Sequence, residues 1–124
     1  MEIQLELEIE GKCPSKKNQY KQGRGHWYKP KEVNDFIESA LWQIKGQMAT
    51  KEKIKKLLPI KGNVGVYFMF EMIGRDRDID GMTTTILDVL QSAGIFNNDA
   101  QVVDVGAIKY KGKEDLTKIF IKSL

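Results

Sequence analysis

Apolar and polar residues alternate strictly over residues 3–9, with four aliphatic side chains on one face and Gln or Glu on the other. This period of two is typical of a strand that is buried on one face only. Gly11 and Pro14 interrupt the pattern, and the polar stretch over residues 15–28 is predicted to be a long loop. The chain is therefore expected to begin with a half-buried strand followed by that loop.

The middle of the chain predicts two helices and a buried strand. Apolar residues recur at spacings of three and four over residues 33–48, after Pro30, which suits the first turn of a helix. We expect Thr50 to cap a short basic helix over residues 51–58, which Pro59 ends. The run of β-branched and aromatic residues at 64–72 predicts a central strand buried on both faces.

The last third of the chain predicts a helix and two strands. Residues 82–92 carry an apolar stripe at helical spacing, and Gly94 follows as a C-terminal residue of left-handed conformation. Residues 102–110 and 116–121 are predicted strands joined by a turn over residues 111–115. The order of elements predicts an α+β fold, with two main helices and one short basic helix packed against a small mixed sheet.

Composition limits the class of protein. A chain of 124 residues, 41% hydrophobic and 30% charged, is typical of one compact domain over residues 1–124. No apolar stretch approaches the ~20 residues of a membrane-spanning helix, and the start has no signal-peptide pattern, so we expect a cytoplasmic protein. One cysteine and one histidine exclude an intramolecular disulfide and a Cys/His zinc site. A bound metal ion would be a hard one held by oxygen.

The charge is small but unevenly distributed. The formal net charge is +3, yet residues 11–31 hold seven Lys or Arg and no acidic residue. A basic segment beside an acidic cluster favours a polyanionic partner such as DNA. A lysine-rich loop that is merely solvated is the alternative.

Four aspartates carry the candidate chemistry: Asp76, Asp78 and Asp80 after the predicted central strand, and Asp99 after the following helix. Crowded carboxylates resist joint ionisation unless they share a cation. If residues 76–80 stay extended, Asp78 and Asp80 share a face about 6.6 Å apart. We expect the helix to double back and return Asp99 to the same end of the sheet. Such a site suits Mg²⁺ or Mn²⁺ and phosphodiester hydrolysis.

The acidic run has two other interpretations. Residues 76–81 match the first six positions of an EF-hand loop, but the twelfth position is Leu87 rather than the required Glu. In a purely structural interpretation, Asp80 is a helix N-cap, Asp78 makes an Asx-turn, and Arg75 and Arg77 neutralise both. The first alternative is disfavoured, and the second stays open.

An ordered set of motifs is similar to one known family. The set comprises Gly11-Lys12-Cys13-Pro14-Ser15-Lys16-Lys17-Asn18, Arg77-Asp78-Ile79-Asp80, Leu87-Asp88-Val89-Leu90 and Gly94-Ile95-Phe96-Asn97-Asn98-Asp99-Ala100-Gln101. In these motifs the chain resembles RusA-type Holliday junction resolvases, small homodimeric magnesium-dependent endonucleases of bacteria and their prophages. The resemblance covers most of the chain and implies a RusA-like fold and a role in DNA recombination and repair.

The resemblance also implies roles for individual residues. It implies that Asp78, Asp80 and Asp99 are the metal-binding catalytic carboxylates, with Mg²⁺ as cofactor and Mn²⁺ as a possible substitute, whereas Asp76 has no firm counterpart. The implied substrate is a branched DNA, a four-way junction, bound by a homodimer. The predicted DNA contacts are Lys12, Lys16, Lys17, Asn18, Arg77 and Lys109.

The chain departs from the family pattern at two positions. Gly81 stands where the family has Asn, and Thr84 stands where the family has an active-site Lys. Arg77, Lys109 or Lys16 are candidates to replace that cation. The departures leave open a catalytically weak or inactive junction-binding protein of the same fold. A protein-interaction domain with a structural acidic turn is the other open alternative.

Overall fold

The computed structural model describes residues 2–15, 21–23, 26–28 and 31–124, and over residues 21–28 the description covers the backbone alone. Its elements in chain order are β1 (Gln4–Glu10), β2 (Lys21–Gly23), β3 (His26–Tyr28), α1 (Lys31–Met48), α2 (Glu52–Lys55), β4 (Val64–Met72), α3 (Ile79–Ser92), the 3₁₀ helix η2 (Asp99–Gln101), β5 (Val102–Lys111) and β6 (Leu116–Ser123). The predicted main helices and strands are confirmed.

The main sheet has the strand order β1-β6-β4-β5. β4 runs parallel to β5 and antiparallel to β6, which in turn pairs antiparallel with β1, so the predicted mixed sheet is confirmed. β5 and β6 are consecutive in the chain, but β4 lies between them. The parallel pair requires that α3 carry the chain back along the strands before β5 begins.

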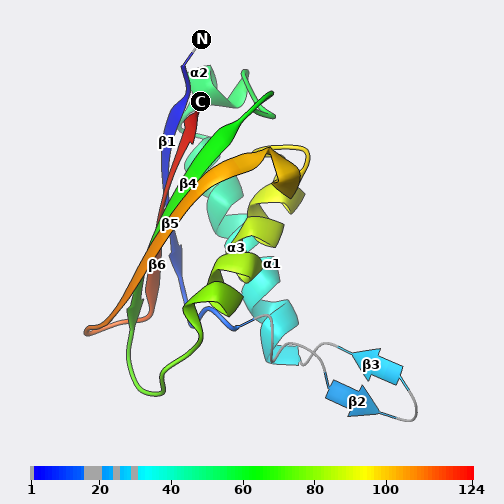
Figure 1. Cartoon of the computed structure of the whole chain (residues 1–124), viewed down its shortest axis with the longest axis vertical. Coiled ribbons are helices and arrows are strands. Elements are labelled where there is room, and N and C mark those ends of the chain that lie inside the picture. The colour runs from blue at the N-terminus through cyan, green and yellow to red at the C-terminus, as the bar shows by residue number, and fades with distance from the viewer. Residues whose placement is uncertain (1, 16–20, 24–25, 29–30) are drawn as a thin grey trace.

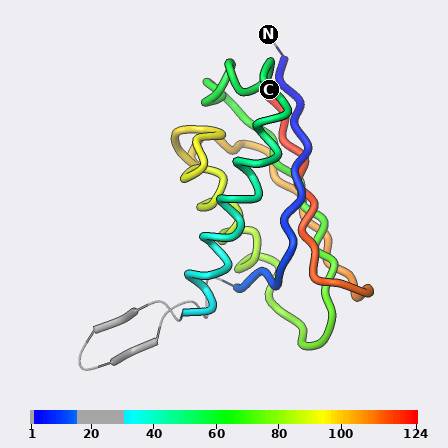
Figure 2. Tube along the Cα trace, turned by 180° about the vertical axis from the view of Figure 1, so that it is seen from behind, coloured from blue at the N-terminus to red at the C-terminus, as the bar shows by residue number. Residues whose placement is uncertain are grey.

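The helices α1 and α3 cover one face of this sheet (Figures 1 and 2). Alternate strand residues point toward the helices, because successive side chains of a strand point to opposite faces. The buried core comprises Leu5, Leu7, Ile9, Val66, Phe68, Phe70, Ile119 and Ile121 from the sheet and Ala40, Ile44, Met82, Ile86 and Leu90 from the helices. The fold is therefore a two-layer α+β arrangement.

The opposite face of the sheet is only partly covered. Met69 on β4 is 42% exposed and Ile108 on the neighbouring β5 is 55% exposed. The prediction of a strand buried on both faces is therefore wrong for β4, although β4 is central. The reason is that both long helices pack on the same side of the sheet, so the apolar side chains of the other face have no second layer.

The two edges of the sheet differ. At the β1 edge, Gln43 accepts a hydrogen bond from the Glu10 amide (2.7 Å) and donates one to its carbonyl (3.0 Å). Gln47 does the same with Glu8, at 2.9 and 2.6 Å. These side chains of α1 satisfy backbone groups that an edge strand otherwise exposes. In the described part of the chain no side chain caps the β5 edge in this way.

Three local predictions are corrected. The predicted loop over residues 15–28 contains a short antiparallel hairpin of β2 and β3, whose three-residue strands are too short to show a period. Thr50 is not an N-cap: its hydroxyl donates to the Gln47 carbonyl, and α2 begins after Lys51. The helix predicted to begin at Met82 begins at Ile79, so residues 76–80 are not all extended.

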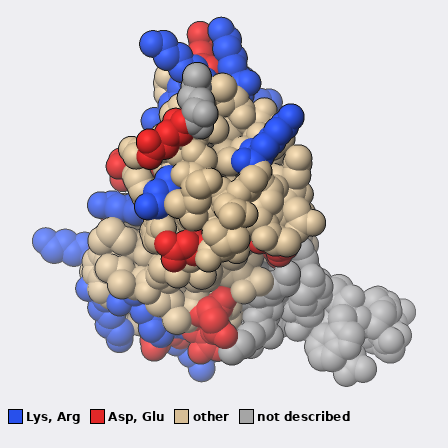
Figure 3. All heavy atoms as spheres, turned by 45° about the horizontal axis from the view of Figure 1, so that its top comes forward, with Lys and Arg blue, Asp and Glu red and all other residues tan. Residues whose placement is uncertain are grey.

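The described residues on the face that Figure 3 presents carry both signs of charge. Basic and acidic side chains are interspersed on that face. No helix among the described residues is long and apolar enough to cross a membrane.

Candidate active site

Asp78 and Asp80 lie at the beginning of α3, directly after the loop that leaves β4 (Figure 1). Asp78 occupies the N-cap position with extended backbone angles (φ −64°, ψ 127°), and its side chain makes no capping hydrogen bond. Asp80 lies in the first helical turn, where its carboxylate accepts a hydrogen bond from the Gly81 amide at 3.0 Å. Both side chains are exposed. Asp80 is therefore not the N-cap, and the chain places two accessible carboxylates at one helix end.

Contacts from β5 and the β5–β6 turn hold the loop before Asp78. Lys109 on β5 pairs with the Asp76 carboxylate at 3.0 and 3.1 Å and donates to the Arg77 carbonyl at 2.9 Å. The Arg77 guanidinium pairs with Asp115 at 3.0 Å. The hydrogen bond from Lys109 lowers the pKa of the Asp76 carboxyl, outweighing the opposite effect of desolvation. This loop is thus fixed over the last part of β5.

Asp99 opens η2, which a network around Gln101 holds in place. The Gln101 side chain accepts from the Asn97 and Asn98 amides at 2.9 and 3.1 Å. It also donates to the carbonyls of Ile60 and Gly62, both at 2.8 Å. The Asp99 amide donates a hydrogen bond to the Gln91 side chain at 3.0 Å, and the Asp99 carboxylate is exposed. Asp99 is therefore presented on a rigid turn near the C-terminal end of α3.

Asp99 does not join Asp78 and Asp80 within one chain. The two aspartates precede and open α3, whereas Asp99 follows its end, and 14 helical residues span about 21 Å. The strand register supports this separation, because the first residue of β4 pairs with the first residue of β5. No group of three metal-ligating side chains occurs among the described residues. The predicted return of Asp99 to the end of the sheet that carries Asp78 and Asp80 is wrong. Parallel strands begin at the same end of a sheet, so Asp99, which precedes β5, lies at the opposite end from the two residues that follow β4.

The segment from Gly11 to Ser15 packs on the first turns of α3. The Thr85 hydroxyl donates to the Pro14 carbonyl at 2.8 Å and to the Gly81 carbonyl at 3.0 Å. Cys13 is buried beside Met82, and burial raises the pKa of its thiol to about 12, against the opposing effect of the Arg77 charge. Cys13 therefore serves as a core side chain and stays protonated at neutral pH.

Gly81 lets this segment approach α3 closely. A Cβ atom at position 81 would lie 1.8 Å from the Ser15 hydroxyl oxygen and 3.1 Å from its Cα atom. The segment therefore fits only against a residue without a side chain. This contact gives a physical reason for the glycine at a position where the resembling family has Asn.

Gly81→Ala is expected to destabilise the protein by roughly 1–3 kcal/mol, because the added methyl group overpacks the contact with Ser15. Urea unfolding measures the change. Gly46→Ala in α1 is the matched control, since nothing lies within 4 Å of its added Cβ, and it should stabilise by up to about 1 kcal/mol. A stabilised Gly81→Ala protein would contradict the observed packing.

The predicted DNA contacts fall into three groups. Lys12 is exposed, and it lines a cavity together with Arg77. Lys109 is partly buried, and its ammonium group is engaged by Asp76 and the Arg77 carbonyl. Lys16, Lys17 and Asn18 lie outside the described residues.

Three residues of the site were not singled out from the sequence. Asp115 fixes Arg77 and also accepts from the Ile73 amide at 3.3 Å. Ser15 is 5% exposed and contributes a buried hydroxyl beside Gly81. Phe36 forms part of the cavity wall. The contacts of Asp115 and Ser15 with α3 and its preceding loop join residues far apart in the chain, and no local pattern marks them.

Two comparisons with known proteins point to the same family. A family description, endodeoxyribonuclease RusA, matches residues 10–122. The crossover junction endodeoxyribonuclease RusA of Aquifex aeolicus (strain VF5) is 30% identical over 121 residues, covering 90% of this chain and 86% of that protein. These matches confirm the resemblance drawn from the motifs. The chain belongs to the RusA family of endodeoxyribonucleases.

Proposed function

We propose that this protein is a structure-selective DNA endonuclease that resolves four-way Holliday junctions by magnesium-dependent phosphodiester hydrolysis, in DNA recombination and repair. The observation that carries the proposal is the family match over residues 10–122 together with the exposed pair Asp78 and Asp80 at the start of α3. Family membership implies a nuclease, and the carboxylate pair supplies oxygen ligands for the chemistry.

Within one chain, the candidate ligands provide only part of a site for a hard divalent ion. Asp78 and Asp80 offer carboxylate oxygens of the kind that Mg²⁺ and Mn²⁺ prefer. Asp99 lies at the far end of α3, so one chain lacks the third carboxylate. When bound, such an ion would activate water and offset charge on the phosphoryl oxygens. In our proposal the missing carboxylate is Asp99 of a second copy.

The uncapped β5 edge is the surface through which we propose that two copies pair. Val103, Val105 and Ile108 on this strand are 57%, 51% and 55% exposed. Exposed apolar edge strands are templates for pairing with another strand. On the opposite edge, the backbone groups of Glu8 and Glu10 in β1 are occupied by Gln47 and Gln43. The contrast favours β5 as the place where a second copy binds.

Antiparallel pairing of two β5 strands would complete the site. A two-fold axis near the middle of β5 sets the start of one strand beside the end of the other. The loop carrying Asp76 is fixed over the end of β5 by Lys109. Asp99 of the second copy, just before its own β5, would then stand next to Asp78 and Asp80. Each homodimer would hold two equivalent composite sites.

Two sites related by a two-fold axis suit the proposed substrate. A four-way junction has approximate two-fold symmetry, and its resolution requires paired cuts in two strands. Lys12 and Arg77 lie close to the start of α3 and are proposed DNA contacts, together with Lys16, Lys17, Asn18 and Lys109. Contacts of lysine and arginine with phosphates position DNA without reading its sequence.

One observation favours a catalytically weak or inactive junction-binding protein as the alternative. Thr84 replaces the Lys expected from the family pattern, and its hydroxyl donates to the Asp80 carbonyl at 2.8 Å. Position 84 therefore offers no cation to a phosphate. Lys109, a candidate replacement, is already paired with Asp76.

Incubation of the wild-type protein with a synthetic four-way junction tests the proposal. We expect paired nicks near the branch point with Mg²⁺ or Mn²⁺ and none with EDTA, and a linear duplex of the same sequence should stay intact. Tight junction binding without nicks in either metal would support the alternative. Absence of binding at low salt would refute both, and would leave the interaction domain with a structural acidic turn.

A further inference from the structure

An open cavity with a volume of about 430 Å³ is lined by residues of α1, of α2 and the turn after it, and of the C-terminal end of α3. We call it the α2 cavity. Its apolar lining includes Leu41, Leu58 and Ala93, one from each of these three parts, and all three side chains are half-buried. A ligand can therefore touch them from solvent. Apolar surface that stays in contact with water favours burial by a partner.

The charged side chains that line the α2 cavity are all basic. Lys45 on α1 and Lys55 on α2 are both exposed, and among the described residues no Asp or Glu contributes to the lining. Residues 51–61, which include α2, hold five lysines and one acidic residue. Clustered charge of one sign attracts ligands of the opposite sign. The charge at this cavity therefore favours an anionic ligand.

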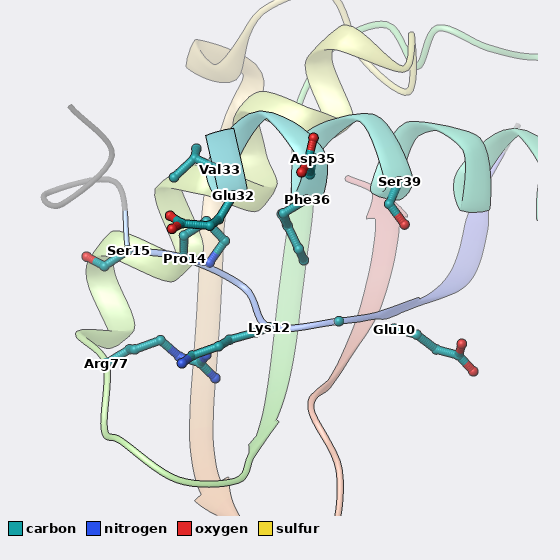
Figure 4. Close-up of a pocket in the computed structure, with 11 residues that line it drawn as sticks. Glu10, Lys12, Pro14, Ser15, Glu32, Val33, Asp35, Phe36, Ser39 and Arg77 are labelled. Atoms are coloured by element: carbon teal, nitrogen blue, oxygen red, sulfur yellow. The ribbon is translucent and has the colours of Figure 1, made fainter. Parts of the chain in front are cut away.

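Two other cavities of the structure carry both signs of charge. Figure 4 shows one of them, next to the first turns of α1, where Lys12 and Arg77 occur together with Glu10, Glu32 and Asp35. The other lies on the open face of the sheet, where Lys118 of β6 lines it together with two glutamates of β1. Mixed charges do not select an anion. Of these three cavities, only the α2 cavity combines apolar surface with charge of a single sign.

An acidic peptide matches this combination better than DNA does. Backbone phosphates bind lysines at a surface and do not need an apolar cavity beside them. A peptide with carboxylates next to an aliphatic or aromatic residue uses both features. Its carboxylates pair with the lysines at the rim, and its apolar side chain is buried in the centre, where most of the affinity of such contacts arises.

We propose that the α2 cavity is a docking site for an acidic peptide segment of a partner protein, with one apolar side chain in the cavity and carboxylates on Lys45 and Lys55. The inference goes beyond the proposed nuclease function and does not depend on it. The cavity lies at the end of α3 opposite to Asp78 and Asp80 (Figure 1). A bound partner would therefore leave the start of α3 accessible.

Fluorescence anisotropy with synthetic peptides tests the apolar part of the proposal. The probe is a short fluorescein-labelled peptide of aspartates with one phenylalanine near its middle, and a second peptide has alanine in place of that phenylalanine. The full-length protein should bind the first peptide about 10-fold or more tightly than the second, because only the phenylalanine fills the cavity. Equal binding of the two peptides would show attraction by charge alone and would overturn the docking site.

Lys55→Glu tests the basic rim of the cavity. It should weaken binding of the phenylalanine peptide about 5-fold or more, because a salt bridge is replaced by repulsion between carboxylates. Lys118→Glu is the matched control, since Lys118 is also exposed but lies on β6 in the sheet layer. The same change of charge at that position should leave binding unchanged. Equal losses in the two variants would show that only net charge matters, against the proposal.

Ala93→Leu fills part of the cavity. It should weaken binding of the phenylalanine peptide about 10-fold and should have little effect on the alanine peptide. Its melting temperature shows whether the variant is folded. Should it not fold, Ser92→Leu places a side chain of the same size at an exposed position of the same lining. Full binding of the phenylalanine peptide by a folded variant would overturn the site.

Junction binding in EDTA separates the docking site from the nuclease proposal. Folded Ala93→Leu should bind a synthetic four-way junction as tightly as the wild type does. Weaker junction binding would identify DNA as the occupant of the cavity, and a changed mass in light scattering would identify a second copy. Either result would overturn the peptide site. A wild-type protein that binds the phenylalanine peptide but no junction would instead refute the nuclease proposal and retain the docking site.

Discussion

Mixing the Asp80→Asn and Asp99→Asn variants is expected to restore nicking activity that neither variant has alone. Each variant by itself should lose about a thousandfold or more of its activity, because every site of the proposed homodimer would lack one proposed metal ligand. In a mixed dimer, one composite site carries both substitutions and the other carries none. Random mixing in equal amounts should therefore recover about a quarter of the wild-type sites.

The form of the DNA product distinguishes a mixed dimer from the wild-type enzyme. On a supercoiled plasmid that extrudes a cruciform, the wild type should give linear DNA through paired cuts, whereas a mixed dimer with one intact site should give only the nicked circle. Both variants should still bind the junction, which serves as the folding control. If every site lay within one chain, the mixture would stay as inactive as its components, and the composite site would be excluded.

Ile108→Lys is expected to make the protein monomeric and to reduce junction cleavage about 100-fold or more. Ile108 is 55% exposed on β5, so a lysine is tolerated by the isolated subunit. In the proposed dimer, a lysine on this strand would oppose pairing with a second strand, as charged residues do on natural edge strands. Light scattering coupled to size-exclusion chromatography measures the mass, and junction nicking measures the activity.

Trp42→Lys provides the matched control for this substitution. Trp42 is 64% exposed on α1 and lies away from the β5 edge. Its replacement adds the same charge to the surface and should leave both the mass and the cleavage rate unchanged. A dimeric and fully active Ile108→Lys protein would show that β5 is not the surface that joins the copies.

The sequence predicted the regular elements well because each has a strong local period. Strict alternation identified β1, and apolar spacings of three and four identified α1 and most of α3. Boundaries were less accurate where polar residues occupy helix ends, as at Ile79. The hairpin of β2 and β3 was missed because strands of three residues carry almost no periodic signal.

The position of Asp99 could not be obtained from motif spacing. The prediction treated a strand followed by a helix as a path back to the aspartates. In a parallel β4–α3–β5 unit, the helix instead returns the chain to the start of the strand, about 21 Å from Asp78. In our proposal Asp99 meets Asp78 and Asp80 only in an assembly of two copies, which no single-chain pattern encodes.

Gln43 and Gln47, the α1 side chains that bond to β1, limit how many copies the proposed assembly can hold. Two copies joined through β5 would form one continuous sheet whose outer margins are the two β1 strands, each with backbone groups already bonded to Gln43 and Gln47. A third copy would find the Glu8 and Glu10 part of each β1 strand already occupied. The same α1 side chains that finish the subunit's sheet would thus terminate growth at a closed pair and keep the assembly from elongating into fibres.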